Sequence, residues 1–150
     1  MAYEPHGRYR ISVHDRVVIL ITSGPHNYES FHSYTRDFDA VAAKMARSGP
    51  WSLLIISLKS IAMGPEAEEL MRNYVRAVAG AGVECVAHSF EFLDEWKTLS
   101  VEQWTRVYGG VEGVPWRLFV ANGEAMDWLA ERGYPCSLSA EDSAFIEANR

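Results

Sequence analysis

The chain has 150 residues, which is the length of one ordinary domain with a single core. Hydrophobic residues make up 48% of it and charged residues 23%, which excludes a disordered chain. The formal net charge of −6 at pH 7 argues against a nucleic-acid-binding protein, because contacts to phosphates need a basic face.

The two cysteines, Cys85 and Cys136, form neither a disulfide framework nor a CxxC motif. The first ten residues lack the apolar segment of a signal peptide, and no run approaches the roughly 18 apolar residues of a membrane-spanning helix. We therefore expect a reduced, cytoplasmic protein with no membrane span.

The N-terminal part of the chain predicts a hairpin. Tyr9, Ile11 and Val13 alternate with polar residues, which is typical of a half-exposed strand. After a short turn at His14 and Asp15, the β-branched run Val17–Ile21 indicates a strand that is buried on both faces. We expect the first strand to lie at or near an edge of the sheet.

Helices and buried strands then alternate. Asn27 is expected to cap a long helix that ends at Gly49 and Pro50. The apolar segment Trp51–Ser57 predicts a second buried strand, and Pro65 is expected to be the first residue of the next helix.

The last elements are shorter. Val83–Ala87 predicts a third buried strand, and Ser100 with Gln103 has the spacing of a capping box at the start of a short helix. Pro115–Val120 predicts the final strand, and Asn122 is expected to cap the helix after it. The remaining residues are polar, with at most one helical turn near Phe145.

This order of elements, β-β-α-β-α-β-α-β-α, predicts an α/β domain over residues 8–134 and a polar C-terminal tail over 135–150. Strands that alternate with helices form a mostly parallel sheet with helices on both faces. The hairpin makes the five-stranded sheet mixed, with an antiparallel N-terminal strand.

Ligands in open α/β sheets bind beyond the carboxyl ends of the strands, where the starts of helices also point. Free amides and Lys59 could hold an anion there, and Met63 and Phe90 could form an apolar floor. The alternative is that these loops only cap helices. The candidate ligand-binding residues are His26, Asn27, Lys59, Ser60, Met63, His88 and Phe90, with Trp96 and Trp104 as an aromatic wall.

The chemistry of these residues indicates binding, not catalysis. His26 and His32 are six residues apart and do not have the spacing of a helical metal pair. The chain contains no GxSxG nucleophile motif and no glycine-rich phosphate loop. We expect no catalytic residues, metal or cofactor; an enzyme that uses His26 or His88 as a base is the less favoured alternative.

Three features together resemble a known group. These are VVILITSGPHN after the hairpin, Trp51 at the start of the third strand, and AMDWL (Ala125 to Leu129) after the last strand. The order of elements and these segments resemble the STAS-like superfamily, and more closely its SpoIIAA-like bacterial proteins, over residues 8–133. The resemblance implies a small cytoplasmic α/β domain that works by binding.

Anti-sigma-factor antagonists of this superfamily bind a kinase and are phosphorylated on a serine at the start of the helix after the third strand. In this chain Gly64 and Pro65 occupy about that place, and the aspartates of the family motif are missing. The resemblance therefore implies no kinase switch here. The SpoIIAA-like branch is also similar in fold to CRAL-TRIO lipid carriers, which implies an apolar ligand under the later helices.

Two functions follow as hypotheses. The first is a non-enzymatic regulatory or scaffold domain that acts through protein contact. The second is a carrier or sensor of a lipid or another small hydrophobic molecule, suggested by the aromatic-rich segment from Phe90 to Tyr108. A homodimer is compatible with either function.

Overall fold

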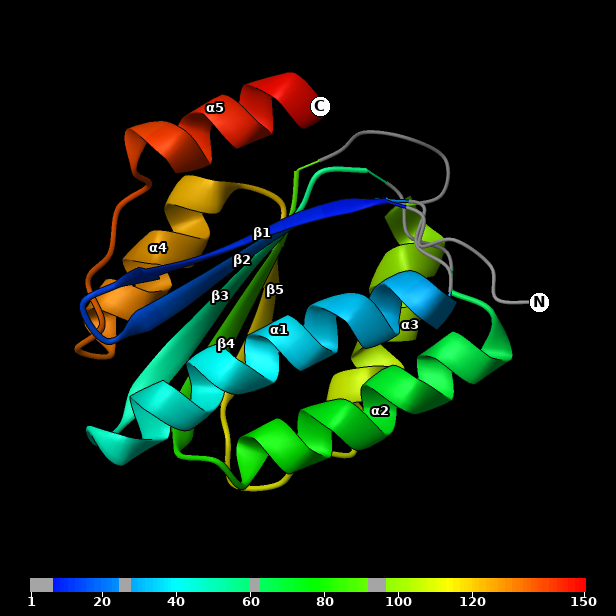
Figure 1. The fold of residues 1–150 in the computed structure, drawn as a ribbon, viewed down its shortest axis with the longest axis horizontal. Coiled ribbons are helices and arrows are strands. Elements are labelled where there is room, and N and C mark those ends of the chain that lie inside the picture. The colour runs from blue at the N-terminus through cyan, green and yellow to red at the C-terminus, as the bar shows by residue number, and fades with distance from the viewer. Residues whose placement is uncertain (1–6, 25–27, 60–62, 92–96) are drawn as a thin grey trace.

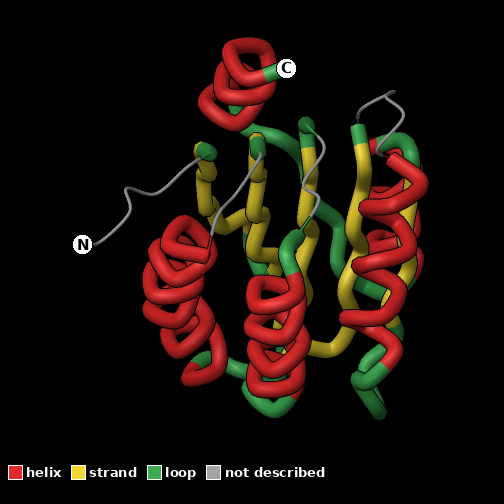
Figure 2. Tube along the Cα trace, turned by 90° about the vertical axis from the view of Figure 1, so that its right-hand side faces the viewer, coloured by secondary structure: helices red, strands yellow, loops and turns green. Residues whose placement is uncertain are grey.

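The computed structural model describes residues 7–24, 28–59, 63–91 and 97–150, which are drawn in colour in Figure 1. One five-stranded sheet lies between two layers of helices (Figure 2). This arrangement confirms the predicted α/β class with helices on both faces.

The strands follow one another across the sheet in sequence order, β1-β2-β3-β4-β5. The edge strand β1 pairs antiparallel with β2, and every other pair is parallel, so the predicted mixed sheet is confirmed. The strands are β1 (Arg8–His14), β2 (Val17–Ser23), β3 (Trp51–Ser57), β4 (Val83–Phe90) and β5 (Trp116–Phe119).

The helices divide between the two faces. Each of the first three joins one parallel strand to the next, and crossovers of one handedness place all three on one face. That face carries α1 (Tyr28–Arg47), α2 (Pro65–Ala79) and α3 (Lys97–Gly109). The opposite face carries α4 (Asn122–Glu131) and α5 (Ala140–Asn149).

Sequence and structure agree where the apolar pattern is strong. All side chains of β2 and β3 are buried, because helices cover the sheet on both faces. Pro65 is the first residue of α2, as predicted. Asp15 has a φ of 52° in the turn between β1 and β2, a conformation that tight hairpins require.

Two predicted helix caps are wrong. Because α3 begins at Lys97, Ser100 lies inside the helix and Gln103 binds the backbone of Met63 instead of completing a capping box. The N-cap of α4 is Ala121, without a side-chain bond. The Asn122 side chain instead accepts a hydrogen bond of 2.7 Å from the Ser89 hydroxyl, because both lie at the carboxyl end of the sheet.

The C-terminal segment also differs from the prediction. Instead of one turn near Phe145, it forms the ten-residue helix α5, which packs against β1 and β2. Ser139 and Asp142 form a capping box at its start, and Ile146 is buried against the sheet. The segment is therefore part of the sheet's second helix layer.

Candidate functional site

The carboxyl ends of β2, β3 and β4 lie side by side, and the predicted site falls there. Ser57 is in register with Thr22 on one neighbouring strand and with Phe90 on the other. Four predicted site residues, His26, Asn27, Ser60 and Trp96, lie outside the described residues. Lys59 is exposed, and the other four are buried: Met63, His88, Phe90 and Trp104.

A chain of hydrogen bonds runs through the buried imidazole of His88. Nε2 lies 2.8 Å from the Ser57 hydroxyl, and Nδ1 lies 2.8 Å from the hydroxyl of Tyr108 on α3. His88 is fully buried, and this burial lowers its pKa to about 3. Burial likewise raises the pKa of the Tyr108 hydroxyl, so all three groups are uncharged at neutral pH.

Aromatic rings enclose this imidazole. Phe90 stacks on it with ring centroids 4.3 Å apart, and Trp104 contacts it edge-on at 4.7 Å. The structure thus brings three predicted site residues, His88, Phe90 and Trp104, into one cluster. Because His88 has no solvent-exposed surface, this arrangement gives a substrate no access to the ring.

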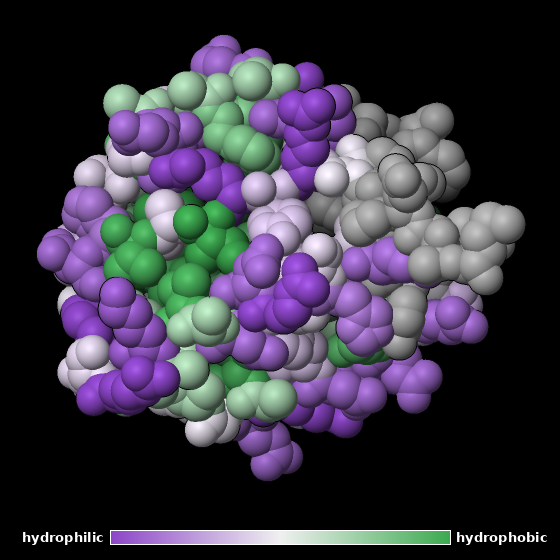
Figure 3. All heavy atoms as spheres, in the orientation of Figure 1, coloured by the Kyte–Doolittle hydropathy of each residue, from purple (hydrophilic) through white to green (hydrophobic). Residues whose placement is uncertain are grey.

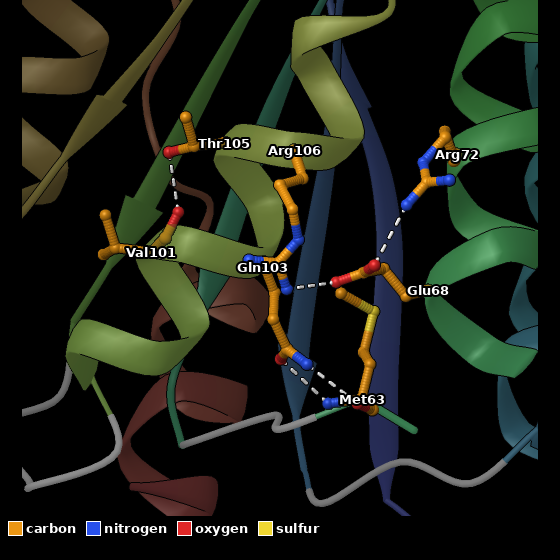
Figure 4. A network of polar contacts seen from close by, with 7 residues as sticks. All are labelled: Met63, Glu68, Arg72, Val101, Gln103, Thr105 and Arg106. Atoms are coloured by element: carbon orange, nitrogen blue, oxygen red, sulfur yellow. Dashed lines mark hydrogen bonds and ion pairs between the residues drawn. The ribbon is translucent and has the colours of Figure 1, made fainter. Parts of the chain in front are cut away.

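Met63 is held close to this cluster by α3. Its backbone N–H donates to Oε1 of Gln103 at 3.0 Å, and its carbonyl accepts from Nε2 of Gln103 at 2.8 Å (Figure 4). Glu68 on α2 also binds Arg106 on α3, at 2.6 Å, and Arg72 on its own helix, at 3.0 Å. These contacts join the start of α2 to α3.

An apolar cavity of about 40 Å³ lies between the sheet and the layer of α1, α2 and α3. Val78 and Val86 are among its apolar lining residues, and so are Trp104 and Tyr108, which both contact His88. A single water needs only about 10–15 Å³, but a water also needs polar partners, and an apolar cavity of this kind stays dry. The cavity is therefore a gap in the packing of the core.

Four buried polar atoms near this end of the sheet have no hydrogen-bond partner within the described part of the chain. They are Oγ1 of Thr22, Oε2 of Glu91, Oγ of Ser100 and Nε1 of Trp104. Leaving a buried donor or acceptor unpaired lowers stability by roughly 1–3 kcal/mol. Of these residues, Trp104 also lines the cavity.

A second candidate site lies on the outside of the molecule, along the edge strand β1. Strongly hydrophobic side chains gather over the half of β1 that leads into the hairpin (Figure 3). Val13 is 50% exposed there, and Ile11 and Val41 of α1 are half-buried. We call Ile11, Val13 and Val41 the β1 patch. Val120, 61% exposed, lies after the opposite edge strand, β5.

Sequence reasoning missed Ser57, Tyr108 and the β1 patch as site components. Ser57 carried a signal, because it is a polar residue that ends a buried apolar strand. Tyr108 carried none, because its hydroxyl reaches His88 only through the packing of α3. The alternation in β1 predicted a half-exposed strand but not which of its side chains α1 covers.

Comparisons with family models, curated proteins and solved structures found no match to this chain. Within the described residues, no cluster of three or more histidine, cysteine or acidic side chains is arranged to hold a metal. No helix in the same ranges has the length and apolar character to cross a membrane.

Proposed function

We propose that the chain is a non-enzymatic binding domain that acts through protein contact at the β1 patch. The observation that carries the proposal is the half-exposed Val13 on an edge strand whose outer side pairs with no strand among the described residues. Exposed apolar side chains grouped on an edge strand are typical of surfaces that bind another chain.

Two further observations support the proposal. His88, a candidate base from the sequence, is neutral and sealed by Phe90 and Trp104, which disfavours an enzyme built on it. The resemblance of residues 8–133 to SpoIIAA-like proteins favours binding as well. The expected cytoplasmic location, with Cys85 and Cys136 as free thiols, belongs to the same proposal.

Site-specific photo-cross-linking tests this function. A benzophenone amino acid replaces Val13 in one variant and Val120 in a matched control, and each protein is irradiated in extract of its native cells. We expect a discrete cross-linked protein from position 13 that disappears when Ile11→Lys is added, and none from position 120. Identical products from both positions, or products insensitive to Ile11→Lys, would contradict the proposal.

Binding of a small apolar molecule in the cavity is a second candidate function. The observation that favours it is the apolar cavity itself, whose lining residues include Trp104, a residue with an indole N–H that has no partner within the described part of the chain. A ligand with an apolar body and one hydrogen-bond acceptor would fill the gap and satisfy this donor. Benzene occupies an engineered cavity of about 150 Å³, so a ring or an acyl chain requires α2 and α3 to move outward here.

A matched pair of probes tests this candidate. Acetophenone and ethylbenzene have similar size, but only acetophenone has an acceptor oxygen. We expect acetophenone to raise the melting temperature more than ethylbenzene, and Trp104→Phe to remove the difference. No shift with either probe, or the same preference in Trp104→Phe, would contradict a ligand at this indole.

A further inference from the structure

We infer that the partner of the β1 patch is a single extended segment of another protein, which joins the sheet as an antiparallel strand along β1. This inference rests on the protein-contact function proposed above and specifies the shape and chemistry of the partner.

The geometry of the hairpin determines which backbone N–H and C=O groups of β1 form hydrogen bonds with β2. The turn between β1 and β2 contains only Asp15 and Arg16, and His14 pairs with Val17 across it. In a two-residue hairpin this closing pair exchanges both of its hydrogen bonds. Bonded and non-bonded pairs then alternate along an antiparallel ladder.

Because of this alternation, the backbone N–H and C=O groups of every second residue of β1 form no ladder bonds with β2. Ser12, Arg10 and Arg8 follow His14 in the bonded set. The N–H and C=O groups of Tyr9, Ile11 and Val13 therefore point away from β2. Within the described residues no strand pairs with this side of β1, so its groups are available to an added strand.

The side chains of the same three residues determine what the partner presents on one face. Tyr9 contacts Tyr34 of α1 with ring centroids 5.7 Å apart, which places Tyr9, Ile11 and Val13 on the α1 side of the sheet. A strand added here would lay alternate side chains beside Ile11, Val13 and Val41. Those partner residues must be apolar.

The other face of β1 determines the remaining residues of the partner. Arg8 and Arg10 are the charged residues of this row, which Ser12 and His14 complete. Arg8 is exposed, whereas Arg10 binds Asp142. Opposite charges on directly paired strands stabilise by roughly 0.2–1 kcal/mol, so acidic residues between the apolar ones suit this row.

The position of α1 argues against a second copy of the chain at this edge. α1 lies beneath β1 at the end of the row of strands (Figure 2). Asp37 of α1 accepts a hydrogen bond from Tyr9. Two copies joined through β1 would place these strands about 4.8 Å apart, whereas packed helices need about 8–10 Å between axes. The two α1 helices would overlap, and a lone strand avoids this conflict.

A synthetic peptide, acetyl-EVEIEVE-amide, tests the inference by nuclear magnetic resonance titration of the full chain. We expect the largest amide shifts at Tyr9, Ile11 and Val13, and weaker binding to Val13→Lys than to the matched control Val120→Lys. N-methylation of the peptide's valine and isoleucine residues should weaken binding at least tenfold. N-methylation of its glutamates, whose N–H groups face away from β1, should not.

The outcomes separate this inference from the function on which it rests. Equal binding by the two N-methylated peptides, or no binding up to millimolar concentration, would overturn strand addition. The cross-link at position 13 would still report independently on protein contact. A dimer in light scattering that Ile11→Lys abolishes would overturn the choice of an extended segment over a second copy.

Discussion

Asp142 on α5 accepts a hydrogen bond of 2.8 Å from Nε of Arg10 on β1, which joins residues 132 positions apart in the sequence. The same carboxylate oxygen accepts a bond of 2.9 Å from the Ser12 hydroxyl, and the second oxygen accepts from the Ser139 backbone at 3.0 Å. One carboxylate thus caps α5 and attaches it to the edge strand.

Replacing Asp142 by asparagine should lower the free energy of unfolding by about 1–3 kcal/mol at pH 7, because a charged acceptor of several bonds is lost. Denaturant unfolding measures this, with Glu141→Gln, an exposed residue of the same turn, as the control. An effect no larger than that of Glu141→Gln would contradict the role given to Asp142.

The same variant should show a pH dependence with a defined sign. Burial by itself raises the pKa of Asp142, but hydrogen bonds from Arg10, Ser139 and Ser12 outweigh it and hold the pKa below its ordinary value. The carboxylate therefore stabilises the fold above about pH 4, and this stabilisation is lost as the pH falls further. The difference between wild type and Asp142→Asn should shrink below pH 4, and an undiminished difference would exclude this linkage.

His88 should weaken the fold at mildly acidic pH. Its pKa is lowered to about 3 by burial, whereas in the unfolded chain the imidazole takes up a proton near pH 6.5. The unfolded state binds more protons between these values, so the free energy of unfolding should fall by about 2 kcal/mol between pH 7 and pH 5 from this residue.

Denaturant unfolding at the two pH values checks this. His88→Gln, which keeps hydrogen-bonding groups but does not titrate, should be less stable than wild type at pH 7 and should lose less stability at pH 5. A proton on the His88 ring of the folded protein at pH 5, seen by nuclear magnetic resonance, would refute the account of a sealed, neutral imidazole.

The cavity should accept one additional methyl group. Val86→Ile places it on a wall residue of β4, so the free energy of unfolding should rise by up to about 0.8 kcal/mol. Val17→Ile, at a fully buried position on the opposite face of the sheet, should instead destabilise by about 1–3 kcal/mol through overpacking. Equal changes in the two variants would indicate that the gap is not an available space.

Local sequence patterns predicted the strands that are buried on both faces of the sheet. β2 and β3 appear in the sequence as continuous apolar runs because helices cover both of their faces. α5 was missed because its buried residues include Asp142 and Asn149, whose burial depends on contacts to β1 and β2. The caps at Ser100 and Asn122 failed because tertiary partners determined where α3 and α4 begin.

The sequence predicted only part of the candidate sites, because the other part depends on tertiary packing. The rule that ligands bind at the carboxyl ends of strands located His88, Phe90 and Trp104, and the structure places them in contact. No local pattern could show that Tyr108 closes the hydrogen-bond chain or that α1 leaves Val13 half exposed. Both depend on how helices from distant parts of the sequence pack on the sheet.

The free edge of β1 is the central claim, and residue-resolved amide hydrogen exchange of the purified protein tests it most directly. We expect slow exchange at Arg10 and Ser12, whose N–H groups bond to β2, and fast exchange at Ile11 and Val13, whose N–H groups face outward. Equal protection of all four amides would show that the edge is already covered, which would contradict a binding surface along β1.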